Sequence, residues 1–169
     1  GKTEWFADTD GDDRADQSKV LFEGWGIRDT HATASNLRYG FDNWIWGVVG
    51  YSGFNGNVGG KDMRFGQGIF RFKPDGTALE FVRSSNNNTW GLAFTEDNVV
   101  IGSTANGNAS MYMPIANRYY EAVNGWSASR LESIADSQKF YPITQKVRQV
   151  DWHGKYTAGS GSAVYTARH

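Results

Sequence analysis

The sequence predicts an all-β protein, a β-propeller of four-stranded antiparallel blades, from two observations. First, residues 37–47 and 92–102 superpose at an offset of 55 residues, so that a leucine, an Asp-Asn turn and a closing glycine coincide. Self-similarity at about 50 residues, carried by β-hairpins, is typical of propeller blades. Second, 21 glycines and an aromatic content of 15% fit many turns around a core of large rings.

Runs of apolar and β-branched residues between turn residues predict the strands in order along the chain. Outside the two superposed hairpins, the predicted strands are 4–7, 19–23, 68–72, 79–82, 111–113 and 161–166. The order hairpin, loop, hairpin occurs twice, which predicts repeats at about 4–49 and 68–104. A third, degraded repeat is expected at about 111–166, so the chain holds about three blades.

Two segments interrupt this order. Residues 50–67 are rich in glycine and are expected to form a long loop. Residues 116–146 are expected to be an irregular insertion, with a short helix at 128–135. We expect aromatic residues of the strands to belong to the core, namely Tyr39, Phe41, Trp44, Trp46 and Trp90. Aromatic residues of the loops are candidates for ligand contact, namely Tyr51, Phe54 and Trp126.

Three blades do not close a ring, because propellers typically have four to eight. An open end would leave unpaired strand edges in water. We therefore expect either that residues 1–169 are one partial propeller domain of a longer protein, which we favour, or that copies of the chain associate. The remainder of the propeller or a homo-oligomer is thus an expected partner.

The composition limits the other partners. A formal net charge of −1 provides no basic field for a phosphate backbone, so nucleic acid is not expected as a partner. No apolar run approaches the roughly 18 residues of a membrane span. Because the chain has no cysteine, a disulfide, a thiolate nucleophile and a cysteine-ligated metal are excluded.

An acidic loop at residues 8–16 predicts a calcium site. Carboxylates stand at positions 1, 3, 5 and 9 of this loop, as in calcium-binding loops: Asp8, Asp10, Asp12 and Asp16. Asp13 stands where the sharp-turn glycine usually lies, and Lys19 replaces the bidentate glutamate, so binding is expected to be weak, on the order of 10⁻⁴ to 10⁻³ M. The alternative is a solvated acidic turn without a metal.

The loop at residues 25–36 carries the first candidate for chemistry. His31 follows Asp29 there, and a histidine near a carboxylate can take a proton from a hydroxyl group near neutral pH. We therefore expect His31 to be a catalytic base; the alternative is a structural, hydrogen-bonding histidine.

The loop at residues 84–90 carries a row of amides. At the offset of 55 residues, Asn86 corresponds to His31, and Asn87 and Asn88 follow it. If the two loops belong to adjacent blades, the histidine and the amides face one ligand.

Residues 31–47 and 87–94 resemble the blades of the soluble PQQ-dependent sugar dehydrogenases. They resemble more closely the large bacterial propeller proteins described as membrane-bound dehydrogenases, many of which continue into a c-type cytochrome segment. The resemblance implies a six-bladed propeller whose axial cavity binds pyrroloquinoline quinone (PQQ) with calcium. The family's catalytic histidine precedes a leucine by six positions, as His31 precedes Leu37, so the resemblance implies that His31 drives hydride transfer to the quinone.

The resemblance also implies the cofactor contacts. The family's Arg-Asn-Pro-x-Gly-Leu motif falls on residues 87–92, where Asn88 is retained and Asn87 replaces the arginine. A bidentate arginine suits the three carboxylates of PQQ better than an amide does, and Arg83 is a candidate to compensate. The cofactor-binding residues expected on this basis are Asn86, Asn87, Asn88 and Arg83.

Two functions remain open. One is an oxidoreductase of the PQQ-dependent type that acts on a sugar or an alcohol. The other is a non-catalytic, calcium-stabilised propeller module that binds glycan or protein. The resemblance and the calcium loop favour a periplasmic or extracellular protein. A hydrolase has little support, because the sequence has no nucleophile elbow and no carboxylate pair at a readable spacing.

Overall fold

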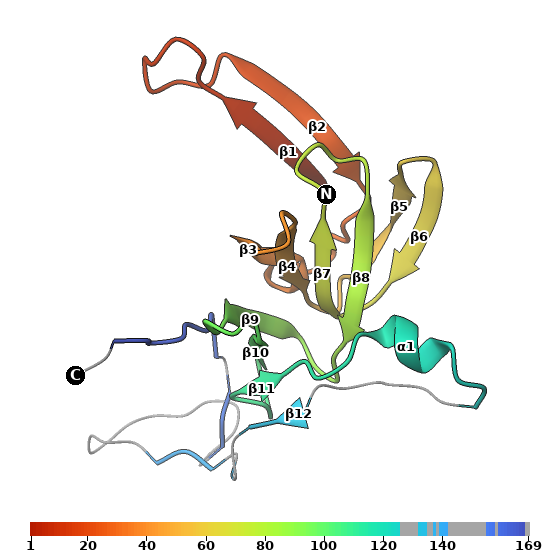
Figure 1. Ribbon diagram of the computed structural model, residues 1–169, viewed down its shortest axis with the longest axis vertical. Coiled ribbons are helices and arrows are strands. Elements are labelled where there is room, and N and C mark those ends of the chain that lie inside the picture. The colour runs from red at the N-terminus through yellow and green to blue at the C-terminus, as the bar shows by residue number, and fades with distance from the viewer. Residues whose placement is uncertain (126–131, 135–136, 138, 142–154, 158, 168–169) are drawn as a thin grey trace.

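A computed structural model describes residues 1–125, 132–134, 137, 139–141, 155–157 and 159–167 (Figure 1). Nearly all of its regular structure is β, which confirms the predicted all-β class. The strands are β1 (Lys2–Ala7), β2 (Gln17–Glu23), β3 (Ala34–Tyr39), β4 (Ile45–Val49), β5 (Phe54–Val58), β6 (Lys61–Phe65), β7 (Gly68–Phe72), β8 (Leu79–Ser84), β9 (Thr89–Phe94), β10 (Val100–Thr104), β11 (Met111–Tyr112) and β12 (Glu132–Ser133). The helices are a 3₁₀ turn, η1 (Thr30–Ala32), and α1 (Asn117–Glu121).

The described strands form two four-stranded antiparallel sheets and two hairpins. One sheet has the order β3-β4-β7-β8 and the other the order β9-β10-β11-β12, while β1-β2 and β5-β6 are two-stranded. Four antiparallel strands are the form expected of a propeller blade. The described residues do not close a ring or a barrel.

The repeat at 55 residues reappears in the backbone. β9 and β10 begin and end 55 residues after β3 and β4. Both connecting turns place an asparagine in the left-handed region, since Asn43 and Asn98 each have a φ of 61°. The turns also make equivalent hydrogen bonds, from the Asn43 amide to the Gly40 carbonyl and from the Asn98 amide to the Thr95 carbonyl. The two hairpins are thus copies of one local structure, and β9 lies against β3 and β4.

The residues that make up each sheet do not coincide with the predicted repeats 4–49, 68–104 and 111–166. β1 and β2 pair only with each other, whereas β4 pairs with β7 along its whole length. β11 pairs with β10 and so extends the second sheet instead of opening a third. The reason is the glycine-rich stretch 50–67, which folds into the hairpin β5-β6 and returns the chain to the edge of β4.

Other predictions near the end of the chain are corrected. Residues 161–166, predicted as a strand, have no regular structure. Most of the predicted helix 128–135 lies outside the described residues, and the part that is described contains the short strand β12. Within the expected insertion 116–146, the described helix is α1. No helix in the described residues is both long and apolar enough to span a bilayer.

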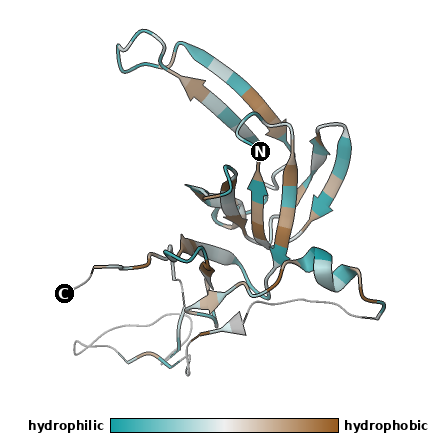
Figure 2. Ribbon diagram, in the orientation of Figure 1, coloured by the Kyte–Doolittle hydropathy of each residue, from teal (hydrophilic) through white to brown (hydrophobic). Residues whose placement is uncertain are grey.

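Two apolar clusters form the core. One joins the two four-stranded sheets and includes Trp46, Val48, Ile69, Val82, Leu92, Val100 and Met111. The other fills the space between β2, the first sheet and β5-β6, and its buried rings are Phe22, Trp25, Phe54, Phe70 and Phe72. Figure 2 shows the outer loop of the β1-β2 hairpin as hydrophilic and the part of β2 nearer the body as apolar. The hairpin is therefore anchored at its base only.

Burial corrects several aromatic predictions. Trp46 is buried as expected, but Tyr39 and Phe41 are 66% and 72% exposed. Tyr39 is the last residue of β3, and Phe41 lies in the turn after it, so both lie at the end of the strand. Phe54 lies on β5 and is buried in the core, whereas Tyr51 is 59% exposed. Trp126 lies outside the described residues.

Candidate functional site

The η1 turn that carries His31 is shaped by Asp29. The Asp29 side chain accepts a hydrogen bond from the His31 amide (2.9 Å), and its carbonyl accepts one from the Ala32 amide (3.1 Å). An aspartate in extended conformation is a favoured cap for such a turn. Ala32 is buried and anchors the turn, while the His31 side chain is 86% exposed. The Nδ1 atom of His31 lies 3.5 Å from Oδ1 of Asp29.

The residues that follow β4 hold this turn from its other end. The hydroxyl of Tyr51 donates to Oδ2 of Asp29, and Oγ of Ser52 donates to the Asp29 carbonyl (2.9 Å). The hydrogen bonds from Tyr51 and from the His31 amide hold the pKa of Asp29 below its ordinary value. The same contact raises the pKa of Tyr51. At neutral pH, Asp29 is therefore anionic and Tyr51 is protonated.

The amide row lies on the loop between β8 and β9. Ser85 Oγ donates to the Asn87 carbonyl (2.8 Å), the Asn88 amide donates to Oδ1 of Asn87 (2.7 Å), and the Ala105 amide donates to the Asn88 carbonyl (2.7 Å). The last of these contacts ties the loop to the residue that follows β10. Beside it lies an open hollow of about 510 Å³, lined by Tyr51, Gln67, Asn86, Asn87, Asn88 and Asn106.

The two loops meet at Gly50. A Cβ atom at this position would lie 1.6 Å from Oδ1 of Asn88 and 2.8 Å from the Ala32 carbonyl oxygen. Tyr51, the next residue, hydrogen-bonds Asp29 and also lines the hollow of the amides. The structure therefore brings the turn of His31 and the row Asn86–Asn88 to one region.

Arg83 does not join this region. It is 3% exposed, its guanidinium stacks 4.8 Å from the ring of Tyr120, and it is not among the residues that line the hollow. The reason is a bulge: the pairing of β7 with β8 shifts between Ile69 and Phe70, so Val82 and Arg83 are both buried in succession. The alternation expected of a strand is interrupted there, which the sequence alone does not reveal.

The lining of the hollow bears on the expected cofactor. Its side chains are a tyrosine and five amides, all neutral, whereas PQQ carries three carboxylates. Arg38 of β3 does not line the hollow either, and it donates to the Ser162 carbonyl at 3.2 Å. The residues that line the hollow therefore do not fit PQQ, although amides and a phenol suit the hydroxyl groups of a sugar or an alcohol.

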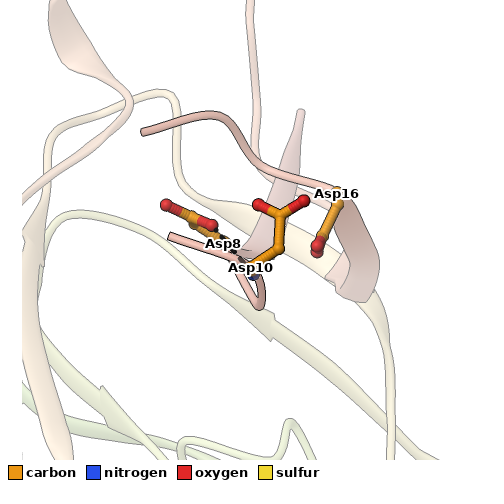
Figure 3. A group of neighbouring side chains, drawn as sticks. All are labelled: Asp8, Asp10 and Asp16. Carbon is orange, nitrogen blue, oxygen red and sulfur yellow. Dashed lines mark hydrogen bonds between the residues drawn. The ribbon is translucent and has the colours of Figure 1, made fainter. Parts of the chain in front are cut away.

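Three of the four predicted metal ligands converge. One carboxylate oxygen each of Asp8, Asp10 and Asp16 lies within 4.8 Å of the others (Figure 3). Hydrogen bonds to Asp8, first of all from the Gly11 amide (2.7 Å), hold the pKa of that carboxyl below its ordinary value. Asp13 adopts a φ of 64°, so it takes the left-handed conformation of the glycine that it replaces.

Asp12 stands apart from this group. Its Oδ1 atom accepts a hydrogen bond from the Arg14 amide (2.9 Å), and it is not one of the converging residues. All of these side chains are exposed, and the loop lies at the outer end of β1-β2 (Figure 1). A cation there would stabilise the hairpin and would not take part in chemistry at His31.

Two residues of the site were not predicted from the sequence. Gln67 and Asn106 line the hollow, although neither was a candidate. For Asn106 the sequence does offer an indication, because Asn106 lies 55 residues after Tyr51 and so occupies the equivalent position in the next repeat. For Gln67 the sequence offers none, because its position depends on the return of β5-β6.

The comparisons with known proteins concern the whole chain. No curated protein and no solved structure matches it. One family model matches residues 1–169, and its description is a domain of unknown function, DUF7133. The match covers both four-stranded sheets, the acidic hairpin and the two candidate loops. The chain therefore belongs to the DUF7133 family.

Proposed function

We propose that this chain is part of a propeller-type oxidoreductase that acts on a hydroxyl group of a sugar or an alcohol, with His31 as the general base. The observation that supports this most is the convergence at Gly50 and Tyr51. There, the η1 turn that carries the exposed imidazole of His31 and the anionic carboxylate of Asp29 meets the loop of amides, and Tyr51 links the turn to the hollow that the amides line. Alcohol oxidation needs a base that is open to the substrate, and a polar lining suits the hydroxyl groups of that substrate.

The chemistry of His31 follows from its neighbours. The neutral imidazole takes the proton of the substrate hydroxyl, so the O–H bond breaks and an N–H bond forms. Asp29 lies beside Nδ1 and stabilises the resulting imidazolium. Tyr51 and Ser52 hold Asp29 in place.

Oxidation also needs an acceptor for the hydride on the same carbon. The resemblance implies a quinone, PQQ, with calcium. Because the lining of the hollow is neutral, we assign Asn86, Asn87 and Asn88 to the substrate and derive no step through the cofactor.

A rate measurement tests the role of His31. We expect His31→Gln to lower the rate of dye reduction with aldoses or alcohols, in the presence of PQQ and Ca²⁺, by about 10² to 10⁴-fold, the usual contribution of a general base. Thr30→Ala, on the same exposed turn, is the matched control and keeps the rate. If His31→Gln keeps the rate as well, His31 is not the base.

The acidic loop favours a second candidate, a calcium-stabilised module that binds glycan or protein without catalysis. Its support is the convergence of Asp8, Asp10 and Asp16. Binding at 10⁻⁴ to 10⁻³ M would suit calcium outside the cytoplasm, in the periplasm or beyond the cell.

Calcium addition tests this candidate. We expect millimolar Ca²⁺ to raise the melting temperature of the protein, because an ion that binds only the folded state stabilises it. Asp10→Asn should abolish the increase, whereas Asp12→Asn, which removes a carboxylate outside the converging group, should keep most of it. An equal loss in both variants would show that the response is only to total charge.

A further inference from the structure

A second hollow, of about 570 Å³, also borders Tyr51. Its size lies in the range of ligand sites. Besides Tyr51 it is lined by Ser52, Asn55, Phe65 and Arg64, and by the backbone of several glycines. Tyr51 thus stands between two hollows, one lined by amides and one containing a guanidinium group.

The walls of this hollow are fixed by close packing. A Cβ atom on Gly26 would lie 2.0 Å from the Ser52 carbonyl oxygen, and one on Gly53, whose φ is 64°, would lie 2.5 Å from the Phe65 carbonyl oxygen. The ring of Phe65 stacks on the buried ring of Phe54, with centroids 5.2 Å apart. The hollow is therefore built from strand ends and packed rings, which hold a ligand more firmly than a free loop does.

Arg64 is the one charged side chain that lines this hollow. It is exposed on β6, and its side chain makes no hydrogen bond or ion pair with the described part of the chain. Two neighbouring acidic residues have other contacts, since Asp62 of the same strand accepts a hydrogen bond from Asn57 (2.7 Å) and Glu23 pairs with Lys2 (3.3 Å). The guanidinium group is thus open to a partner from outside.

We infer that this hollow binds the carboxylate of an acidic sugar, so that the ligand of the site is an oligosaccharide that contains a uronate. A guanidinium group binds a carboxylate by two parallel hydrogen bonds. The ring of Tyr51 offers an apolar face to a pyranose. The lining of this hollow holds one guanidinium group and no second cation. This suits the single negative charge of a carboxylate better than the larger negative charge of a phosphate.

The position of Tyr51 extends this inference to the first hollow. Because Tyr51 lines both, an oligosaccharide that crosses it presents its uronate to Arg64 and the neighbouring sugar to the amides and His31. This second part rests on the proposed function and names its substrate class. The contact with Arg64 does not depend on oxidation.

Calorimetric titration with a matched pair of ligands tests the inference. The pair is cellobiouronic acid, a uronate linked to glucose, and its uncharged methyl ester. We expect the acid to bind at least tenfold more tightly than the ester, which is the usual effect of a hydrogen bond to a charged group. Arg64→Gln should remove this difference in affinity. Arg64→Lys should keep only part of it, because an ammonium group keeps the charge but cannot make the two parallel hydrogen bonds of a guanidinium group. Lys61→Gln removes the same charge from the same strand outside the hollow and should keep the difference.

Equal affinities of acid and ester for the wild-type protein would overturn the inference, as would a difference that persists in Arg64→Gln. Dye reduction separates it from the proposed function. Preferred binding of the acid without any oxidation supports the Arg64 contact and contradicts the oxidoreductase. Oxidation of both ligands at equal rates and with equal affinities supports the oxidoreductase and contradicts the uronate site.

Discussion

Gly50 is the residue on which the arrangement of the two candidate loops depends. A Cβ atom there would overlap Oδ1 of Asn88 at 1.6 Å and press on the Ala32 carbonyl at 2.8 Å. Neither neighbour has room to retreat, because Oδ1 of Asn88 is buried and Ala32 lies in the core. We expect Gly50→Ala to lower the free energy of unfolding by about 1–3 kcal/mol, the usual cost of overpacking, and to weaken sugar binding as the loops separate.

Gly66→Ala is the control for this change. A Cβ atom at Gly66 meets no atom within 4 Å, and its φ is outside the left-handed range, so its stability should match that of the wild type. Urea denaturation measures both variants. An unchanged stability of Gly50→Ala would show that the loops are not in contact.

The positions of single residues show which parts of the candidate site could be predicted from the sequence. His31 and the asparagine row were found because the offset of 55 residues aligns their loops, and the same offset aligns Tyr51 with Asn106. Arg83 was expected to contact the cofactor, but it is buried and does not line the hollow, since a bulge breaks the alternation of β8. A bulge depends on the partner strand, which a single strand's pattern does not contain.

At the scale of elements, Arg71 ties four segments together. From β7 its guanidinium donates to Asp42 in the β3-β4 turn (2.6 Å) and to Glu80 on β8 (2.6 and 2.8 Å). Glu80 also pairs with Arg118 of α1. The Arg71 guanidinium further stacks on Trp44, 4.6 Å from the centre of its ring. The group is mostly shielded from water, so these contacts are stronger than those of a surface ion pair.

We expect Arg71→Met to lower the free energy of unfolding by about 2–3 kcal/mol, because it leaves the half-buried Asp42 without its cation and leaves Glu80 with Arg118 alone. Burial opposes ionisation of Asp42, but hydrogen bonds from Trp46, Trp44 and Arg71 hold its pKa below the ordinary value. A carboxyl with a lowered pKa in the folded state contributes stability above its unfolded pKa of about 4, and this is lost as the pH falls through the folded value.

The loss of stability on acidification should therefore be smaller in Arg71→Met than in the wild type. Guanidinium denaturation at pH 7 and below pH 4 checks both expectations. Arg14→Met, which removes an exposed arginine from the acidic loop, should change stability by less than about 0.5 kcal/mol. A similar effect in both variants would mean that net charge, and not the Arg71 contacts, decides the outcome.

Elements were easier to predict than their pairing. The hairpins β3-β4 and β9-β10 follow from local alternation and an Asp-Asn turn, both of which lie within a dozen residues. The pairing of β4 with β7 joins residues that lie from 19 positions apart (Val49 and Gly68) to 27 positions apart (Ile45 and Phe72), and it depends on how residues 50–67 fold back. Local patterns do not specify such a contact, which is why the predicted repeats divided the chain at other points than the sheets.

At the scale of the whole molecule, β3 is the edge strand of its sheet in the described structure. Leu37 and Tyr39 of β3, and Phe41 in the turn after it, are all more than half exposed. They lie beside a shallow groove of about 500 Å³ that is also lined by Phe94 of the next sheet and by residues 163–164. Exposed apolar edge strands favour association with another chain.

We expect the 169-residue chain to associate with itself in solution, so that its mass in analytical ultracentrifugation rises with protein concentration. Tyr39→Lys should shift the equilibrium toward the monomer by about tenfold or more, because a lysine on an edge strand opposes pairing and the buried ring is lost. Ile27→Lys places the same charge on another exposed apolar residue, away from β3, and should leave the equilibrium unchanged. A chain that stays monomeric at all concentrations, or a Tyr39→Lys variant with an unchanged mass, would show that β3 is not covered by a second copy.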